Sequence, residues 1–141
     1  MSIINKSLSE LVGNGWKDKI PTKDDSYVIR NCYELYNKPL NEFETEDFRF
    51  MIGQKIGLEY TVPLAIDILR NDILAEGDFY EGDLLESVLR VGAEYWAKHP
   101  EYKEEVERLF IAHQKDFEEL DTTEKIKTKI REAFEDFLLN K

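Results

Sequence analysis

The chain has 141 residues, 42% hydrophobic and 12% aromatic, which is enough to fill one core and argues against two independent domains. Its 19 lysines and arginines stand against 30 aspartates and glutamates, and the net charge of −11 argues against nucleic acid or an anionic membrane as a ligand. No apolar run approaches the roughly 18 residues that span a bilayer, and the first residues lack a signal peptide's apolar stretch. We therefore expect one cytoplasmic domain over residues 1–141.

The first two predicted helices are short and begin at serine residues. Ser7-Leu8-Ser9-Glu10 has the spacing of a capping box and predicts a brief helix that ends near Gly13-Asn14-Gly15. A second helix is predicted from Ser26 to Tyr36. It contains Cys32, the only cysteine of the chain, which we interpret as a buried structural thiol.

Two further helices are predicted before the middle of the chain. Thr45 has the side chain of an N-cap, and we expect the helix that follows it to end at Gly57 in the left-handed conformation. Pro63 suits the first turn of the next helix, which is predicted to end at Asn71. The segment from Ala75 to Gly82 is predicted to be a loop.

Three longer amphipathic helices are predicted in the C-terminal half, over about residues 83–96, 100–120 and 124–138. The second begins at Pro100, and the third follows the capping-box spacing of residues 121–124. No segment alternates over a strand's length with turn residues on both sides. The sequence therefore predicts an all-α, single-domain bundle of six or seven amphipathic helices.

The acidic surplus is concentrated in the middle of the chain. Residues 41–83 hold three basic and eleven acidic side chains, so most of the net negative charge lies there. Such asymmetry favours a positively charged partner protein. The alternative is a solvated surface that only keeps the protein soluble, and charge alone does not decide between the two.

No constellation of residues indicates catalysis, a metal or a cofactor. His99 and His113 lack a histidine or cysteine partner at ligand spacing. We interpret His99 as a turn residue and His113 as a hydrogen-bonded core or boundary residue. Gly53 and Gly57 are not part of a phosphate-binding fingerprint. The acidic segment 76–83 lacks the spacing of a calcium-binding EF-hand loop. We therefore predict a protein that is not an enzyme and binds no cofactor.

That acidic segment is the best candidate for a partner-binding site. It sets two aromatic side chains among carboxylates, which is the anatomy of a protein interface with an anchor and a polar rim. The candidate partner-binding residues are Glu76, Asp78, Phe79, Tyr80 and Glu81. We expect Asp83 to cap the following helix instead. The alternative is that Phe79 or Tyr80 fills the core and the loop is only scaffold.

Three segments resemble a known family. They are Glu46–Tyr60, which reads EDFRFMIGQKIGLEY, Val62–Ala65, which reads VPLA, and Glu76–Leu85, which reads EGDFYEGDLL. This pattern resembles the immunity proteins of bacterial contact-dependent growth inhibition systems, best over residues 44–91 and hardly in the C-terminal third. Phe48 and Glu81 depart from the leucine and proline that are usual there.

The resemblance implies a cytoplasmic antidote that binds and neutralises the C-terminal toxin domain delivered by a neighbouring cell. Many such toxins are nucleases with basic surfaces, and an acidic inhibitor matches that potential. We therefore expect a basic nuclease domain as the partner, with no binding to nucleic acid or membrane. The alternative is an acidic helical adaptor or regulator that binds some other basic protein.

Overall fold

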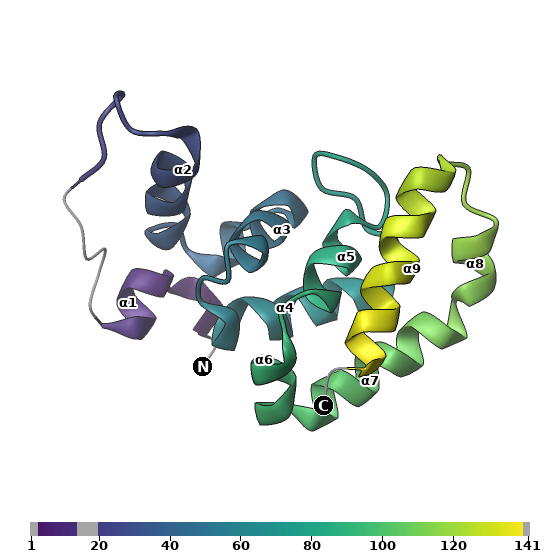
Figure 1. Ribbon diagram of the computed structural model, residues 1–141. Coiled ribbons are helices and arrows are strands. Elements are labelled where there is room, and N and C mark those ends of the chain that lie inside the picture. Colours follow the sequence, from purple (N-terminus) through teal and green to yellow (C-terminus); the bar gives the residue numbers. More distant parts are fainter. Residues whose placement is uncertain (1–2, 14–19, 140–141) are drawn as a thin grey trace.

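A computed structural model describes residues 3–13 and 20–139, and this part of the chain consists of helices and loops without a strand (Figure 1). Its elements, with η for a 3₁₀-helix, are η1 (Ile3–Asn5), α1 (Leu8–Val12), α2 (Tyr27–Tyr36), η2 (Leu40–Glu42), α3 (Thr45–Gly53), α4 (Leu58–Asn71), α5 (Asp83–Leu89), α6 (Ala93–Lys98), α7 (Pro100–Ala112), α8 (Gln114–Glu118) and α9 (Glu124–Leu139). The predicted all-α fold is confirmed. None of these helices is long and apolar enough to cross a membrane.

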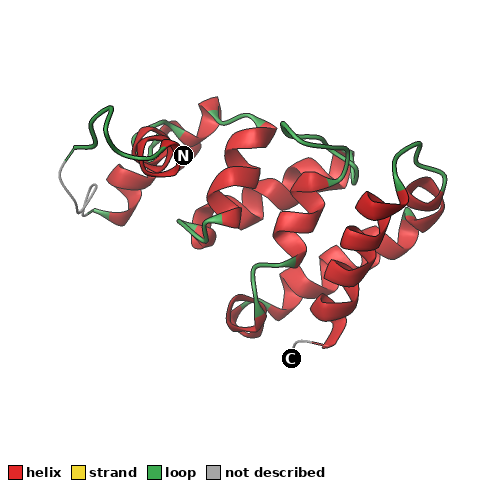
Figure 2. Ribbon diagram, turned by 45° about the horizontal axis from the view of Figure 1, so that its top comes forward, coloured by secondary structure: helices red, strands yellow, loops and turns green. Residues whose placement is uncertain are grey.

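Two hydrophobic cores share α3. The smaller core joins α1, α2, η2 and one side of α3, and includes the fully buried Leu8 and Met51. The main core draws on α3 to α9, where Trp96 and Phe137 meet in a T-shaped contact with ring centroids 5.2 Å apart. Figures 1 and 2 show α1 and α2 at one end of the molecule, α8 and α9 at the other, and α3 between them. Because α3 contributes to both cores and packs against α5, the α3–α5 pair lies in the middle of the described structure.

Side-chain caps determine where several helices begin. The Ser7 hydroxyl accepts from the Glu10 N–H at 3.3 Å, and the Glu10 carboxylate accepts from the Ser7 N–H at 3.0 Å, which confirms the capping box of α1. Ser26, where the second helix was predicted to begin, is the N-cap of α2, and its hydroxyl accepts from the Ile29 N–H at 3.2 Å. Before α9 the cap is Thr123, whose hydroxyl accepts from the N–H three residues on at 3.2 Å, so the box predicted at residues 121–124 was placed two residues too early.

The structure corrects both ends of α3. Glu44, not Thr45, lies at the N-cap position, and its N–H donates to the Asp47 carboxylate at 3.0 Å. The helix ends at Gly53, so Gly57 does not terminate it. The predicted end of the first helix is confirmed at Gly13, which is left-handed with φ of 85°. The two residues after it in that prediction, 14 and 15, lie outside the described part of the chain.

Pro63 does not lie in the first turn of α4 as predicted, because the helix begins earlier, directly after Gly57. Gly57 is left-handed with φ of 66°, and a Cβ there would lie 2.7 Å from the Leu8 Cδ1 atom, so glycine lets the start of α4 pack against α1. Pro63 has no N–H for the carbonyl of Glu59. Since Glu59 is exposed, water can satisfy that carbonyl.

Two of the predicted long helices are each divided into two, which raises the number of α-helices in the described residues to nine. Gly92, with φ of 106°, separates α5 from α6. His113 separates α7 from α8, and its Nδ1 lies 2.9 Å from the carbonyl oxygen of Leu109, which confirms its hydrogen-bonded boundary role. His99 joins α6 to α7 as the predicted turn residue. The predicted burial of Cys32 is also confirmed, and burial raises the pKa of its thiol.

Candidate partner-binding site

The candidate residues lie on the loop of residues 76–82, which joins α4 to α5 and lies beside α3 and α9 in Figure 1. An isolated antiparallel bridge pairs Glu76 with Glu81, so the loop closes on itself like a small hairpin. The N–H of Gly82 donates to the carbonyl of Leu74 at 3.1 Å and ties the end of the loop to its beginning. Gly82 has φ of 92°, a conformation that favours glycine. The loop is therefore a defined structure.

Asp83 organises this loop and does not cap α5. The N-cap position is Gly82, and Asp83 is the first residue of the helix. Asp83 is 3% exposed, and its carboxylate accepts backbone N–H groups from Gly77 at 2.7 Å, Phe79 at 3.0 Å and Tyr80 at 3.4 Å. Charge-assisted bonds of this kind are stronger than neutral ones. The expectation that Asp83 caps α5 was wrong, because its carboxylate accepts hydrogen bonds from the loop residues that precede it.

A second anchor comes from α3, where Glu46 and Arg49 form a bidentate ion pair with both contacts at 2.6 Å. The same Glu46 carboxylate accepts the N–H of Asp78 at 2.9 Å, so it fixes the tip of the loop to the helix. Burial alone would raise the pKa of Glu46, but the hydrogen bonds from Arg49 and from the Asp78 N–H outweigh it and lower the pKa. The carboxylate is thus held in its charged form.

Phe79 does not enter the core and remains 66% exposed. Its ring lies under the guanidinium of Arg49, with the carbon of that group 4.5 Å from the ring centroid. Phe79 is therefore an exposed aromatic side chain whose position is set by a cation from α3. A large apolar side chain held in this way is a suitable anchor for a partner.

Tyr80 has the opposite environment and packs against the main core. Its hydroxyl donates to the buried Glu86 carboxylate, and the Lys129 ammonium of α9 lies 5.3 Å from the centroid of its ring. Burial, followed by the bond to Glu86, raises the pKa of the phenol. Tyr80 therefore fastens the loop to α5 and α9, while Phe79 faces outward.

The three remaining candidates, Glu76, Asp78 and Glu81, are all exposed. Their carboxylates form no hydrogen bond or ion pair with the described residues, although the backbone of each is held in the loop. The structure thus brings together three carboxylates and one exposed aromatic ring on a fixed loop. No group of three or more His, Cys, Asp or Glu side chains in the described ranges is arranged to hold a metal ion.

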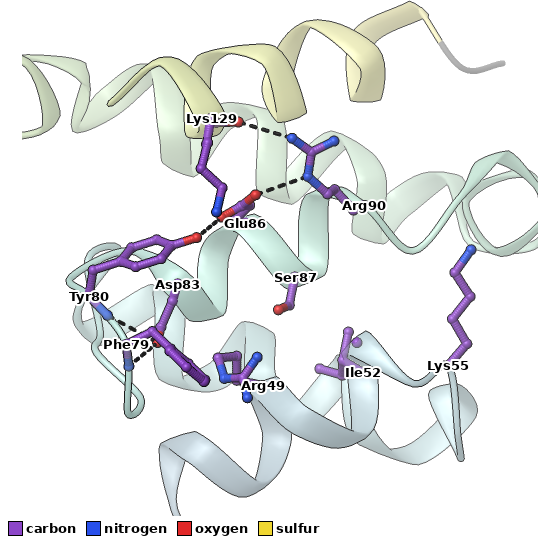
Figure 3. Close-up of a pocket in the computed structure, with 11 residues that line it drawn as sticks. Arg49, Ile52, Lys55, Phe79, Tyr80, Asp83, Glu86, Ser87, Arg90 and Lys129 are labelled. Carbon is purple, nitrogen blue, oxygen red and sulfur yellow. Dashed lines mark hydrogen bonds and ion pairs between the residues drawn. The ribbon is translucent and has the colours of Figure 1, made fainter. Parts of the chain in front are cut away.

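A pocket of about 370 Å³ opens beside the loop, between α3, α5 and α9 (Figure 3). We call it the cationic pocket because four basic side chains line it, namely Arg49, Lys55, Arg90 and Lys129. Sequence reasoning missed it, since these residues are far apart in the chain and only tertiary packing assembles them. The only local signal was Glu46 with Arg49, three residues apart on one helix, which is the spacing of an ion pair.

These features define a helical domain with a fixed, charged and aromatic surface loop. The family model described as CDI immunity proteins matches residues 10–106. The chain therefore belongs to the family of contact-dependent growth inhibition immunity proteins, as the sequence resemblance predicted, and has an immunity function against such a toxin. The match includes α3 and the whole 76–82 loop and ends within α7. No curated protein matches the sequence.

Proposed function

We propose that the chain is a cytoplasmic immunity protein that binds the C-terminal toxin domain of its cognate system and blocks it, that this toxin is a basic nuclease, and that the 76–82 loop contacts it. Family membership supports immunity over the alternative of a general acidic adaptor. The net charge of −11 supports a basic partner, since complementary potentials accelerate encounter and discourage wrong partners. The chain acts by binding and needs no cofactor.

The observation that carries the loop assignment is the contrast between its fixed backbone and its free side chains. Asp83 and Glu46 hold the backbone through four N–H groups. The outward side chains of Glu76, Asp78 and Glu81 make no internal hydrogen bond or ion pair with described residues, and Phe79 is exposed. A preorganised loop of this kind loses little conformational freedom on binding.

Reversing the three loop charges tests this assignment without touching the anchors. The variant E76K/D78K/E81K is expected to fold normally and to associate with the cognate toxin domain about tenfold more slowly at low salt, with a flatter salt dependence. Stopped-flow or surface plasmon resonance measurements give these rates. Cells that produce the toxin domain should also lose protection.

The matched control reverses three exposed carboxylates on the C-terminal helices, in the variant E119K/E132K/E135K. It changes the net charge by the same amount, so a general electrostatic effect would slow both variants equally. The loop assignment requires a much larger effect from the loop variant. If only the control variant binds slowly and fails to protect, the interface lies on α8 and α9 and the loop is scaffold.

A further inference from the structure

The cationic pocket has the opposite charge to the protein that contains it. Besides its four basic residues, two acidic residues line it, Asp83 and Glu86, and both carboxylates are buried and already engaged. Asp83 accepts the three loop N–H groups, and Glu86 accepts from Tyr80 and Arg90. The pocket is thus a local basic region on a chain with a net charge of −11.

The pairing of the four cations differs. Arg49 is neutralised by Glu46, and Arg90 pairs with Glu86 at 3.1 Å and more distantly with Asp136 at 3.8 Å. Lys55 and Lys129 have no ion pair and no side-chain hydrogen bond within the described residues. In Figure 3 Lys129 enters from α9 on one side of the pocket, and Lys55 enters from the connection between α3 and α4 on another.

The backbone at Lys55 is unusual. Its φ is 58°, and it is the one residue other than glycine with a positive φ in the part of the chain that the structure describes. A left-handed lysine costs about 1 kcal/mol relative to glycine or asparagine, and such conformations gather at functional sites. At this position a glycine would satisfy the turn better, whereas the lysine brings an ammonium group to the rim of the pocket.

We infer that the cationic pocket receives an acidic side chain of the toxin, whose carboxylate pairs with one of its two lysines, Lys55 or Lys129. This inference rests on the proposed function, which supplies the partner, and it adds the group that the pocket recognises. The pocket adjoins the loop, since Phe79 and Tyr80 also line it, so one partner surface can reach both. The loop carboxylates then face basic residues of the toxin, while the pocket holds one acidic residue among them.

Charge and size favour a carboxylate over a polyanion. The net negative charge of the chain repels nucleic acid. A single carboxylate on the basic toxin surface can still approach the pocket, because the basic toxin residues around it are attracted to the acidic chain. A volume of about 370 Å³ accommodates an aspartate or glutamate side chain with a few waters. If the toxin bound in another orientation, this carboxylate would face the acidic residues of the 76–82 loop and be repelled. The pocket therefore also favours one orientation of the toxin in the complex.

The test replaces Lys55 and Lys129 with methionine, which removes the charges and keeps an apolar side chain at position 129 to pack on the Tyr80 ring. The variant K55M/K129M is compared with K115M/K125M, which removes two exposed lysines of α8 and α9 that form no ion pair with the described part of the chain. Both variants become more acidic by the same amount. If the toxin senses only overall charge, both bind as tightly as the wild type or more tightly. The pocket predicts that only K55M/K129M weakens, with dissociation about tenfold faster or more in surface plasmon resonance.

Melting temperature checks that both variants fold. If K55M/K129M melts early, K55G/K129M replaces it, because glycine relieves the left-handed backbone at position 55 while removing the same charge. Equal affinity of the folded pocket variant and the control overturns the inference. A wild-type chain that does not bind the toxin domain overturns the proposed function itself, so the two failures are distinguishable.

Substitutions on the toxin identify the occupant. Each acidic residue of the toxin's surface is changed to its amide, and binding is measured to the wild-type chain and to K55M/K129M. One such change should weaken binding to the wild type about tenfold and have little further effect on the pocket variant, which is the signature of a direct pair in a double-mutant cycle. If no acidic residue behaves in this way, the pocket does not hold a toxin carboxylate.

Discussion

The Asp83 carboxylate is the anchor of the loop, and Asp83→Asn tests this with the smallest change of shape. The amide keeps one oxygen but replaces the other with an NH₂ group. That group faces an N–H donor of Gly77 or of Phe79 and Tyr80, depending on its orientation. At least one buried donor loses its acceptor, and the remaining bonds lose their charge assistance.

The expected loss of stability is about 3 kcal/mol, since an unsatisfied buried donor costs about 1–3 kcal/mol and each bond to a charged group contributes about 1.5–3 kcal/mol. For a chain of this length that corresponds to a fall in melting temperature of about 10 °C. Urea denaturation measures the free energy, and hydrogen exchange of the Gly77 and Phe79 amides should accelerate because the loop opens more easily.

The matched control is Asp78→Asn on the same loop, where the carboxylate is exposed and forms no hydrogen bond with the described residues. It should change stability by less than about 0.5 kcal/mol. If Asp83→Asn unfolds at the same urea concentration as this control and its amides exchange no faster, the carboxylate does not hold the loop. The contrast between a fixed backbone and free side chains would then lose its physical basis.

Two further predictions concern the supports of the loop. The folded-state pKa of Glu46 lies below its ordinary value of 4.5, so the stabilisation by its bonds is present above that pH and disappears as the pH falls through the lowered value. Glu46→Gln should therefore be less stable than wild type at pH 7, and the difference in urea stability should shrink as the pH falls below 4.5. A difference that stays constant as the pH falls would contradict the assignment. Gly82→Ala should lose about 1–3 kcal/mol, because its φ is 92° and the new Cβ would lie 2.8 Å from the buried Ile130 Cδ1 atom. Gly53→Ala, with no atom within 4 Å of the added Cβ, should instead gain about 0.5 kcal/mol, and equal melting temperatures for the two variants would refute this packing argument.

The presence of most helices could be predicted from the sequence, because capping residues and the spacing of apolar residues are local features of the chain. The Ser7 cap and the start of α2 at Ser26 lie where they were expected, and the apolar stripes do form the cores. The breaks at Gly92 and His113 could not be predicted with the same rules, since the apolar period continues across both. Pro63 lies inside α4 because the N-terminal side of that helix is packed against Leu8, a contact that no local pattern contains.

The candidate loop was predicted from composition, but the roles of its members depend on tertiary contacts. Asp83 was expected to cap α5 because an acidic residue before an apolar stripe usually does so. In the structure Gly82 occupies that position and Asp83 is free to bind the loop. The division between an exposed Phe79 and a packed Tyr80 depends on Arg49 and Lys129, which come from α3 and α9. The cationic pocket is assembled from the same distant helices.

Protection inside a cell tests the central claim most directly. The cognate toxin domain is expressed from an inducible promoter in the cytoplasm, with and without this chain. We predict that induction of the toxin alone degrades nucleic acid and stops growth, and that co-expression of the chain preserves both nucleic acid and growth. Growth arrest and nucleic-acid degradation that are unchanged by an abundant, folded chain would contradict the account.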